Sequence, residues 1–146
     1  MKTLKIIGLF LFLAGFVQVN AQEVTDYDLQ NFARSYRFTV LLNNEAQREM
    51  QKEIEKEGLT IEKYQLIQES KHPEATLVPD LPEKDFEKFE KLQPKIKEIQ
   101  ADLEKEVLKV YADNDLDKQK YRAIAERVKQ DYLLQAKMEK ILAGMR

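Results

Sequence analysis

Apolar side chains recur every three to four residues along nearly the whole chain after residue 28, and this spacing constrains the fold more than any other feature. Such a stripe lies on one face of an α-helix, whereas a half-buried strand needs alternation at every second residue. The stripe of the first half contains Leu29, Phe32, Tyr36, Thr39, Asn43, Ala46 and Met50. Glycine and proline, which interrupt helices, number only four each. The sequence therefore predicts an all-α protein.

The interruptions of the stripe predict where the first two helices begin and end. Thr25 or Asp26 is a candidate N-cap for the first helix, because a short polar side chain can accept a backbone N–H there. That helix is expected to end at Gly58, the residue type favoured just after a helix. Thr60 can cap a second, short helix, which stops before Pro73.

A third helix is expected from Glu83 to Tyr111. Pro94 lies inside its pattern and lacks an N–H, so we expect either a kink or a restart there. A break at residues 113–115 follows, and Asp117 caps the last helix. The inner face of that helix is expected to contain Tyr121, Ile124, Ala125, Val128, Tyr132, Gln135, Met138 and Leu142.

The second half of the chain repeats the first. Residues 28–71 align with residues 85–128 without a gap, and nine of the 44 pairs are identical. The helix break and restart at residues 57–64 coincide with those at residues 114–121. Each unit is thus predicted to be a long helix, a break with a buried leucine, a capping residue and a second helix with tyrosine in its first turn.

These units predict a single helical domain within residues 22–146, in which residues 72–82 form the linker. One helical hairpin buries its apolar stripe poorly, so two should pack against each other. We expect two antiparallel hairpins that form an arrangement like a four-helix bundle. The sequence leaves open whether this arrangement closes within one chain or between two chains of a homodimer.

Taken together, these features resemble the family catalogued as domain of unknown function 4168 (DUF4168), which comprises small exported bacterial helical proteins. The family pattern is matched in the first half by Phe32, Ala33, Tyr36, Gly58, Leu59, Thr60, Glu62, Tyr64 and Ile67. The second half keeps Phe89, Leu116, Tyr121 and Ile124, but has Asp115 for glycine, Asp117 for threonine and Pro94 near the Tyr36 counterpart. The chain therefore looks like two tandem, divergent copies. The resemblance implies a helical fold and no assigned reaction.

The N-terminal segment, residues 1–21, has the layout of a secretory signal peptide. Lys2 and Lys5 precede an apolar stretch at residues 6–17, and cleavage is expected between Ala21 and Gln22. A retained anchor is the competing interpretation, but a membrane span needs about 20 apolar residues. The chain contains no cysteine, so it cannot be a lipoprotein. We expect a periplasmic or secreted protein with no stable membrane insertion after signal cleavage.

The charge distribution argues against nucleic acid as a partner. Removal of residues 1–21 leaves 22 basic and 26 acidic side chains, which are interspersed along the chain. Nucleic-acid binding needs a concentrated positive face instead.

The sequence predicts no catalytic, cofactor-binding or metal-binding residue. Residues 113–117 resemble the start of a calcium loop, but Lys118 stands where a glycine is needed and Ile124 where a glutamate is needed. His72 is the only histidine and precedes a proline, which indicates an exposed turn. Cysteine is absent and only Ser35 and Ser70 are serines, so we expect the protein not to be an enzyme.

Binding functions remain as hypotheses. The preferred one is an envelope module that binds an unknown protein partner through its helical surface, and a chaperone is one version of it. The alternative is a carrier of a small ligand or lipid in a cavity between the hairpins. The six tyrosines can line such a groove or belong to the core. Asn43 on the apolar stripe can set helix register or be a satisfied core amide.

Overall fold

A computed structural model describes residues 23–74 and 79–145, and its described part contains five helices. They are α1 (Asp26–Lys56), α2 (Ile61–Ser70), α3 (Glu83–Asp113), α4 (Lys118–Gln130) and α5 (Tyr132–Gly144). The described residues include no strand. The predicted all-α class is therefore confirmed. The expected signal peptide, residues 1–21, lies outside the described residues.

Short polar side chains begin three of the helices at the predicted positions. The Thr25 hydroxyl accepts a hydrogen bond from the Asp28 backbone N–H (3.1 Å), and the Asp28 carboxylate accepts one from the Thr25 N–H (3.2 Å). Thr60 and Asp117 each accept a hydrogen bond from the N–H three residues later in the chain. These bonds satisfy N–H groups that have no partner within the helix, and so they determine where each helix begins.

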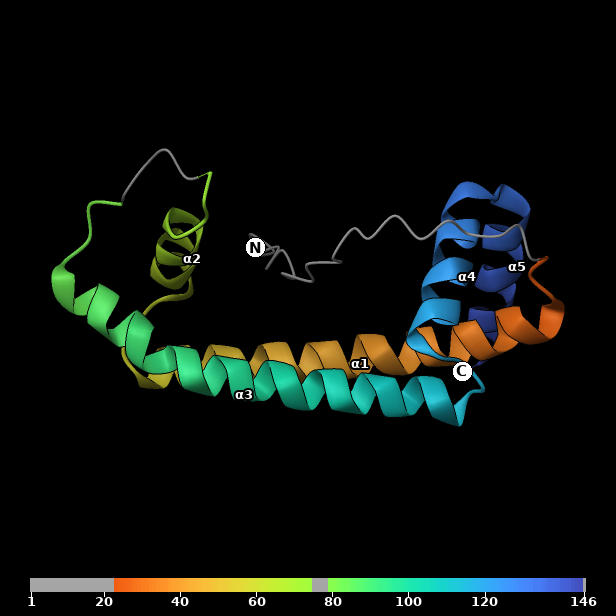
Figure 1. Cartoon of the computed structure of the whole chain (residues 1–146), viewed down its shortest axis with the longest axis horizontal. Coiled ribbons are helices and arrows are strands. Elements are labelled where there is room, and N and C mark those ends of the chain that lie inside the picture. Colours follow the sequence, from red (N-terminus) through yellow and green to blue (C-terminus); the bar gives the residue numbers. More distant parts are fainter. Residues whose placement is uncertain (1–22, 75–78, 146) are drawn as a thin grey trace.

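The two long helices, α1 and α3, lie side by side in opposite directions and form a rod (Figure 1). α2 rises from one end of the rod, and α4 and α5 rise together from the other end (Figure 1). Most of the buried apolar residues form two separate cores. The α5-side core contains Leu29, Phe32, Ala33, Val107, Tyr111, Leu116, Tyr121, Ile124, Val128 and Met138. The α2-side core contains Ile54, Leu59, Tyr64, Ile67, Phe89, Leu92 and Ile96.

Each short helix packs against the start of the long helix of the other unit. The ring centroids of Tyr64 in α2 and Phe89 in α3 are 4.9 Å apart. Those of Tyr121 in α4 and Phe32 in α1 are 4.7 Å apart. Neither α2 nor α4 lies back along its own long helix, as the expected antiparallel hairpins would require (Figure 1). The reason is that the apolar stripes of α1 and α3 bury each other, which leaves the short helices to cover the ends of the rod.

The two breaks between long and short helices have the same local geometry. Gly58 and Asp115 occupy equivalent positions and both have positive φ, of 76° and 54°. The leucine that follows, Leu59 or Leu116, donates its N–H to the carbonyl five residues earlier, at 3.1 and 2.9 Å. This is the pattern of a helix end closed by a left-handed residue, and both leucines are buried as predicted.

Pro94 does not restart α3, which is one helix from Glu83 to Asp113. The N-terminal part of α3 is inclined to the rest, so the helix is bent (Figure 1). A proline inside a helix cannot donate to the carbonyl four residues earlier, and its ring crowds that carbonyl. Of the two expected outcomes, the helix therefore bends and continues.

The prediction of one last helix up to Leu142 is wrong, because the helix breaks at Asp131. The Asp131 carboxylate accepts hydrogen bonds from the N–H groups of Leu133 (2.9 Å) and Leu134 (3.3 Å) and so starts α5. Tyr132, expected on the inner face, is 78% exposed at this break. The spacing of apolar residues continues through the break, and for that reason it did not reveal a new helix start.

Candidate functional site

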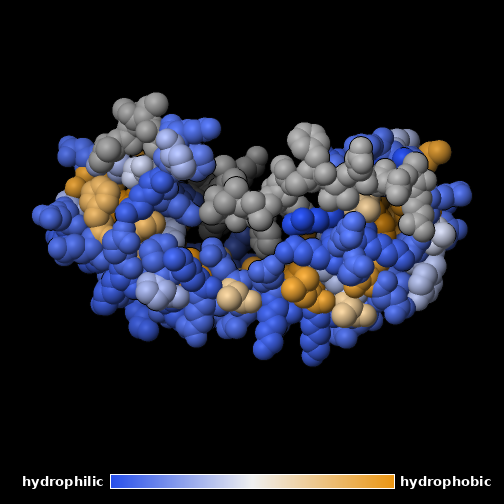
Figure 2. Space-filling view, in the orientation of Figure 1, coloured by the Kyte–Doolittle hydropathy of each residue, from blue (hydrophilic) through white to orange (hydrophobic). Residues whose placement is uncertain are grey.

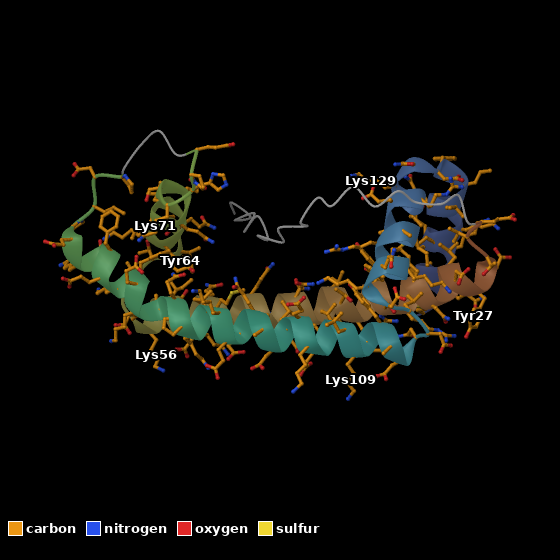
Figure 3. All side chains as sticks on the ribbon, in the orientation of Figure 1. Tyr27, Lys56, Tyr64, Lys71, Lys109 and Lys129 are labelled. Atoms are coloured by element: carbon orange, nitrogen blue, oxygen red, sulfur yellow. The ribbon has the colours of Figure 1, made fainter. Side chains whose placement is uncertain are left out.

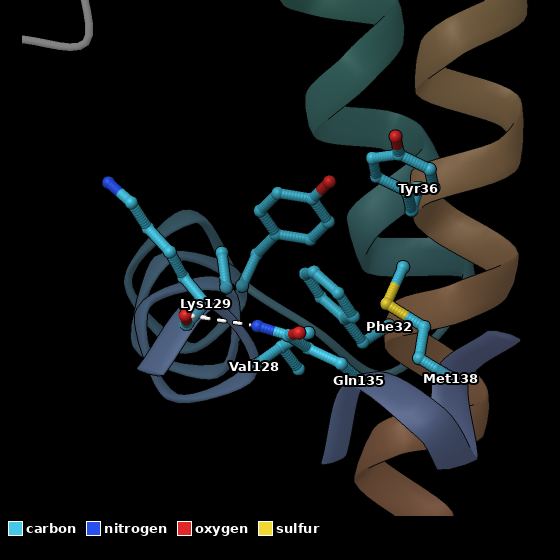
Figure 4. Close-up of a pocket in the computed structure, with 8 residues that line it drawn as sticks. Phe32, Tyr36, Val128, Lys129, Gln135 and Met138 are labelled. Atoms are coloured by element: carbon cyan, nitrogen blue, oxygen red, sulfur yellow. Dashed lines mark hydrogen bonds between the residues drawn. The ribbon is translucent and has the colours of Figure 1, made fainter. Parts of the chain in front are cut away.

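An apolar pocket lies where α1, α4 and α5 meet, and it has a volume of about 330 Å³ (Figure 4). Its lining comes from all three helices and consists of Phe32, Tyr36, Tyr121, Ala125, Val128, Lys129, Gln135 and Met138. Phe32 and Tyr36 are four residues apart on α1 and therefore face the same side of that helix. We call this site the α5-side pocket.

Aromatic rings form one wall of the α5-side pocket, and a buried tyrosine outside the lining stacks on one of them. Tyr121 contacts Phe32 and also stacks on Tyr111, with ring centroids 4.2 Å apart and planes at 17°. Burial raises the pKa of the Tyr121 hydroxyl well above its usual range. Tyr121 therefore stays protonated and neutral at physiological pH, and its ring contributes apolar surface to the pocket.

The break at Asp131 creates the pocket, because it turns α5 back against α4 and α1. The side-chain amide of Gln135 donates a hydrogen bond to the Lys129 carbonyl (3.1 Å), which holds the two helices together at the turn (Figure 4). The side chain of Lys129 extends away from the rings (Figure 4). The pocket thus has apolar walls with a cation and an amide at its rim.

The opposite end of the rod has the same aromatic pair but not the same pocket. In the alignment of the two units, Tyr64 and Phe89 correspond to Tyr121 and Phe32. The counterparts of Tyr36, Ala125 and Val128 are Gln93, Gln68 and Lys71. Lys71 lies over the Phe89 ring, 5.6 Å from its centroid, and Figure 3 shows it beside Tyr64. Polar side chains thus replace the apolar walls at that end.

A second pocket, of about 500 Å³, lies between the end of α1 and the start of α2. It is lined by Gln51, Glu55, Gly58, Leu59, Thr60, Ile61 and Glu62. The lining contains no aromatic and no basic side chain, and Gln51 is already hydrogen-bonded to Glu55 (2.8 Å). The α5-side pocket is therefore the better candidate for a binding site.

Three residues that stood out in the sequence have structural roles: Asp115, His72 and Asn43. Asp115 lies in the helix break and accepts a hydrogen bond from the Tyr27 hydroxyl (2.6 Å). His72 is exposed in the turn after α2. The Asn43 amide donates to the Thr39 carbonyl of its own helix (2.8 Å), as a satisfied, half-buried amide. Within residues 23–74 and 79–145, no three histidine, aspartate or glutamate side chains are grouped so that they could hold a metal ion.

The tyrosines divide between core and surface. Tyr64, Tyr111 and Tyr121 are buried, whereas Tyr27, Tyr36 and Tyr132 are exposed. Only Tyr36 and Tyr121 line the α5-side pocket. The sequence placed Gln135 and Met138 on the inner face of one long last helix, but it did not indicate a pocket there, because the pocket depends on the break at Asp131. Asp131 could have revealed this break, because an aspartate directly before a new apolar run can cap a helix.

Comparison with protein families relates the chain to one of them. The model of a family described as "Domain of unknown function (DUF4168)" matches residues 25–138. The match covers both units and the linker as one stretch and supports the resemblance seen in the sequence. Neither the curated proteins nor the solved structures that were compared gave a match.

Proposed function

The chain belongs to the DUF4168 family, and we propose that it is a non-enzymatic, exported binding protein whose α5-side pocket receives an apolar segment of a protein partner. The observation that carries this proposal is the pocket itself, which has apolar walls and is open to solvent. Its counterpart at the other end of the rod is polar. The apolar walls also belong to the α5-side core, on which α5 packs, and a binding role accounts for the side of the pocket that stays open to solvent.

The size of the pocket favours a protein partner. A volume of about 330 Å³ lies at the lower end of the range of roughly 300–1,000 Å³ that is typical of small-molecule sites. Such sites enclose most of their ligand, whereas this pocket is open on one side. One or two bulky side chains of a partner fit that shape, with the exposed Lys129 available to its charged groups. A chaperone that shields apolar segments is one form of this function.

The alternative function is a carrier of a small apolar or lipid-like ligand. It is favoured by the position of the pocket between α1 and α4, which belong to different units, and by the single cation at its rim. An amphiphile with an anionic head group would satisfy both features.

Export and the absence of catalysis are parts of the same proposal. Export is supported by the charge and apolar pattern of residues 1–21. Among the described helices, none is both long and apolar enough to cross a membrane. The view of the protein as a non-enzyme is supported by the scarcity of nucleophiles and by the position of His72 after α2, whereas the pocket is formed by α1, α4 and α5.

We also propose that the two units arose as copies of one helix–break–helix element. This is supported by the contacts between the units: the short helix of each unit packs on the long helix of the other through equivalent residues. The ring pairs Tyr64–Phe89 and Tyr121–Phe32 are one example. The equivalent left-handed residues Gly58 and Asp115 are another.

Photo-crosslinking in the host cell tests the proposed binding function. A benzophenone amino acid would be placed at Lys129 on the pocket rim, and at the equivalent residue His72 as the matched control. The expected result is an adduct with the mass of a second protein from position 129 and none from position 72. An adduct with the mass of a lipid or metabolite would instead establish the carrier. The binding proposal fails if position 129 gives no adduct, or if both positions capture the same proteins equally.

A further inference from the structure

A stripe of four side chains runs along the solvent-exposed side of α1. It consists of Arg34, Phe38, Leu41 and Glu45, which are spaced by four, three and four residues and therefore share one face of the helix. All four are exposed. Phe38 and Leu41 retain 53% and 51% of their accessible surface, so the centre of the stripe is a solvated apolar patch.

The equivalent face of α3 shows that the fold does not need this patch. In the alignment of the two units, the counterparts of the four residues are Lys91, Lys95, Glu98 and Asp102. Lys95 and Glu98 form an ion pair with each other (3.0 Å) on the surface. A solvated helix face made of such pairs is the ordinary case. The two helices have the same place in the rod, yet one presents charges and the other presents Phe38 and Leu41.

The order of residues in the stripe is self-complementary. In an antiparallel pair of two α1 helices, Arg34 lies opposite Glu45 of a second copy and Phe38 lies opposite its Leu41. The two-fold axis repeats both contacts, so an apolar centre is flanked by two ion pairs of opposite polarity. Within the described chain, neither Arg34 nor Glu45 forms an ion pair, and both are available for this contact.

We propose that this stripe is the contact surface of a homodimer, in which the α1 helices of two copies cross antiparallel about an axis between Phe38 and Leu41. A second copy is the occupant that the stripe itself specifies, because its charges match their own reversed order. The face of the molecule drawn in Figure 2 is mostly hydrophilic with scattered apolar residues. The stripe itself has only two apolar side chains, so the dimer dissociates at low protein concentration. The inference is independent of the proposed function, since Phe32 and Tyr36 of the α5-side pocket lie on roughly the opposite side of α1.

Analytical ultracentrifugation over a wide concentration range measures the dissociation constant of the dimer. Variants of the purified protein in which the charges of the stripe are exchanged test the proposal. Arg34→Glu alone places two acids opposite each other and is expected to weaken the dimer by about tenfold or more. Glu45→Arg alone is expected to do the same. The double variant Arg34→Glu/Glu45→Arg restores both ion pairs with reversed polarity and is expected to recover the original dissociation constant within a few-fold.

Two further variants complete the test. Leu41→Lys is expected to leave a monomer at all concentrations, whereas Asp102→Arg, at the α3 position equivalent to Glu45, is expected to leave the dimer unchanged. Circular dichroism checks that each exposed substitution leaves the fold intact. The proposal is overturned if the unmodified protein is monomeric throughout, if Leu41→Lys dimerises like the unmodified protein, or if the double variant stays as weak as the single ones.

Discussion

The ammonium group of Lys63 lies 2.7 Å from a carboxylate oxygen of Asp85 and so ties α2 to the first turn of α3. The equivalent pair joins Lys120 in α4 to Asp28 in α1, at 2.6 Å. Asp85 is only 2% exposed, whereas the side chain of Asp28 is 16% exposed. Each pair thus fastens a short helix to the other unit's long helix, and the pair at the α2 end is the more deeply buried one.

Removing the charge of Asp85 should destabilise the protein in a manner that depends on pH. The hydrogen bond from Lys63 holds the pKa of the Asp85 carboxyl below its ordinary value of 3.8. A carboxyl with a lowered pKa in the folded state contributes stability above its unfolded pKa, and loses it as the pH falls through the folded value. Asp85→Asn is therefore expected to lower the urea midpoint at neutral pH. Its difference from the unmodified protein should shrink below about pH 4.

Two substitutions serve as controls for that measurement. Asp28→Asn, at the equivalent but more exposed position, is expected to lower the midpoint less. Glu98→Gln removes a surface pair and is expected to change it little. If the loss in Asp85→Asn were the same at every pH, disturbed packing and not the ion pair would account for it.

Gly58→Ala should destabilise the protein by about 1 kcal/mol, because Gly58 has a φ of 76° and a side chain is strained in this left-handed region. An added Cβ would also lie 3.1 Å from Nζ of Lys88, which donates a hydrogen bond to the Gly58 carbonyl (2.9 Å). Gly144→Ala is the matched control, since a Cβ there meets no atom within 4 Å. Thermal unfolding of both variants checks this. Equal stability of the two would contradict the role given to the left-handed turn.

Asp131→Ala should cost about 1 kcal/mol by removing the cap of α5. The N–H groups of Leu133 and Leu134 lose their side-chain acceptor, so hydrogen exchange is expected to become faster at the start of α5. Gln130→Ala, at the preceding exposed position, is the control and should leave exchange unchanged. Unaltered protection in Asp131→Ala would mean that packing of α5, and not its cap, holds the break.

Much of the local structure could be predicted from the sequence. The apolar spacing predicted helices, and Thr25, Thr60 and Asp117 marked three of their starts, because a cap depends only on residues three positions apart. The same holds for the buried leucine at each break and for Gly58 at the end of α1, whereas the left-handed conformation of Asp115 was not predicted. The start of α5 was missed although Asp131 is also a cap, since the apolar spacing runs on through Tyr132 and Gln135 and hides the interruption.

From the sequence one could therefore predict the helical class and most helix boundaries, together with the buried leucine at each break. The three-dimensional structure was needed to show that the long helices pair with each other and that each short helix packs on the opposite unit, where Lys63 pairs with Asp85. It alone brought Phe32, Tyr121 and Met138 together in one pocket and left Phe38 and Leu41 in solvent. This difference arises because a cap or a helix face depends only on neighbours within one or two turns of the chain. Burial depends instead on which apolar face, distant in the sequence, a helix meets.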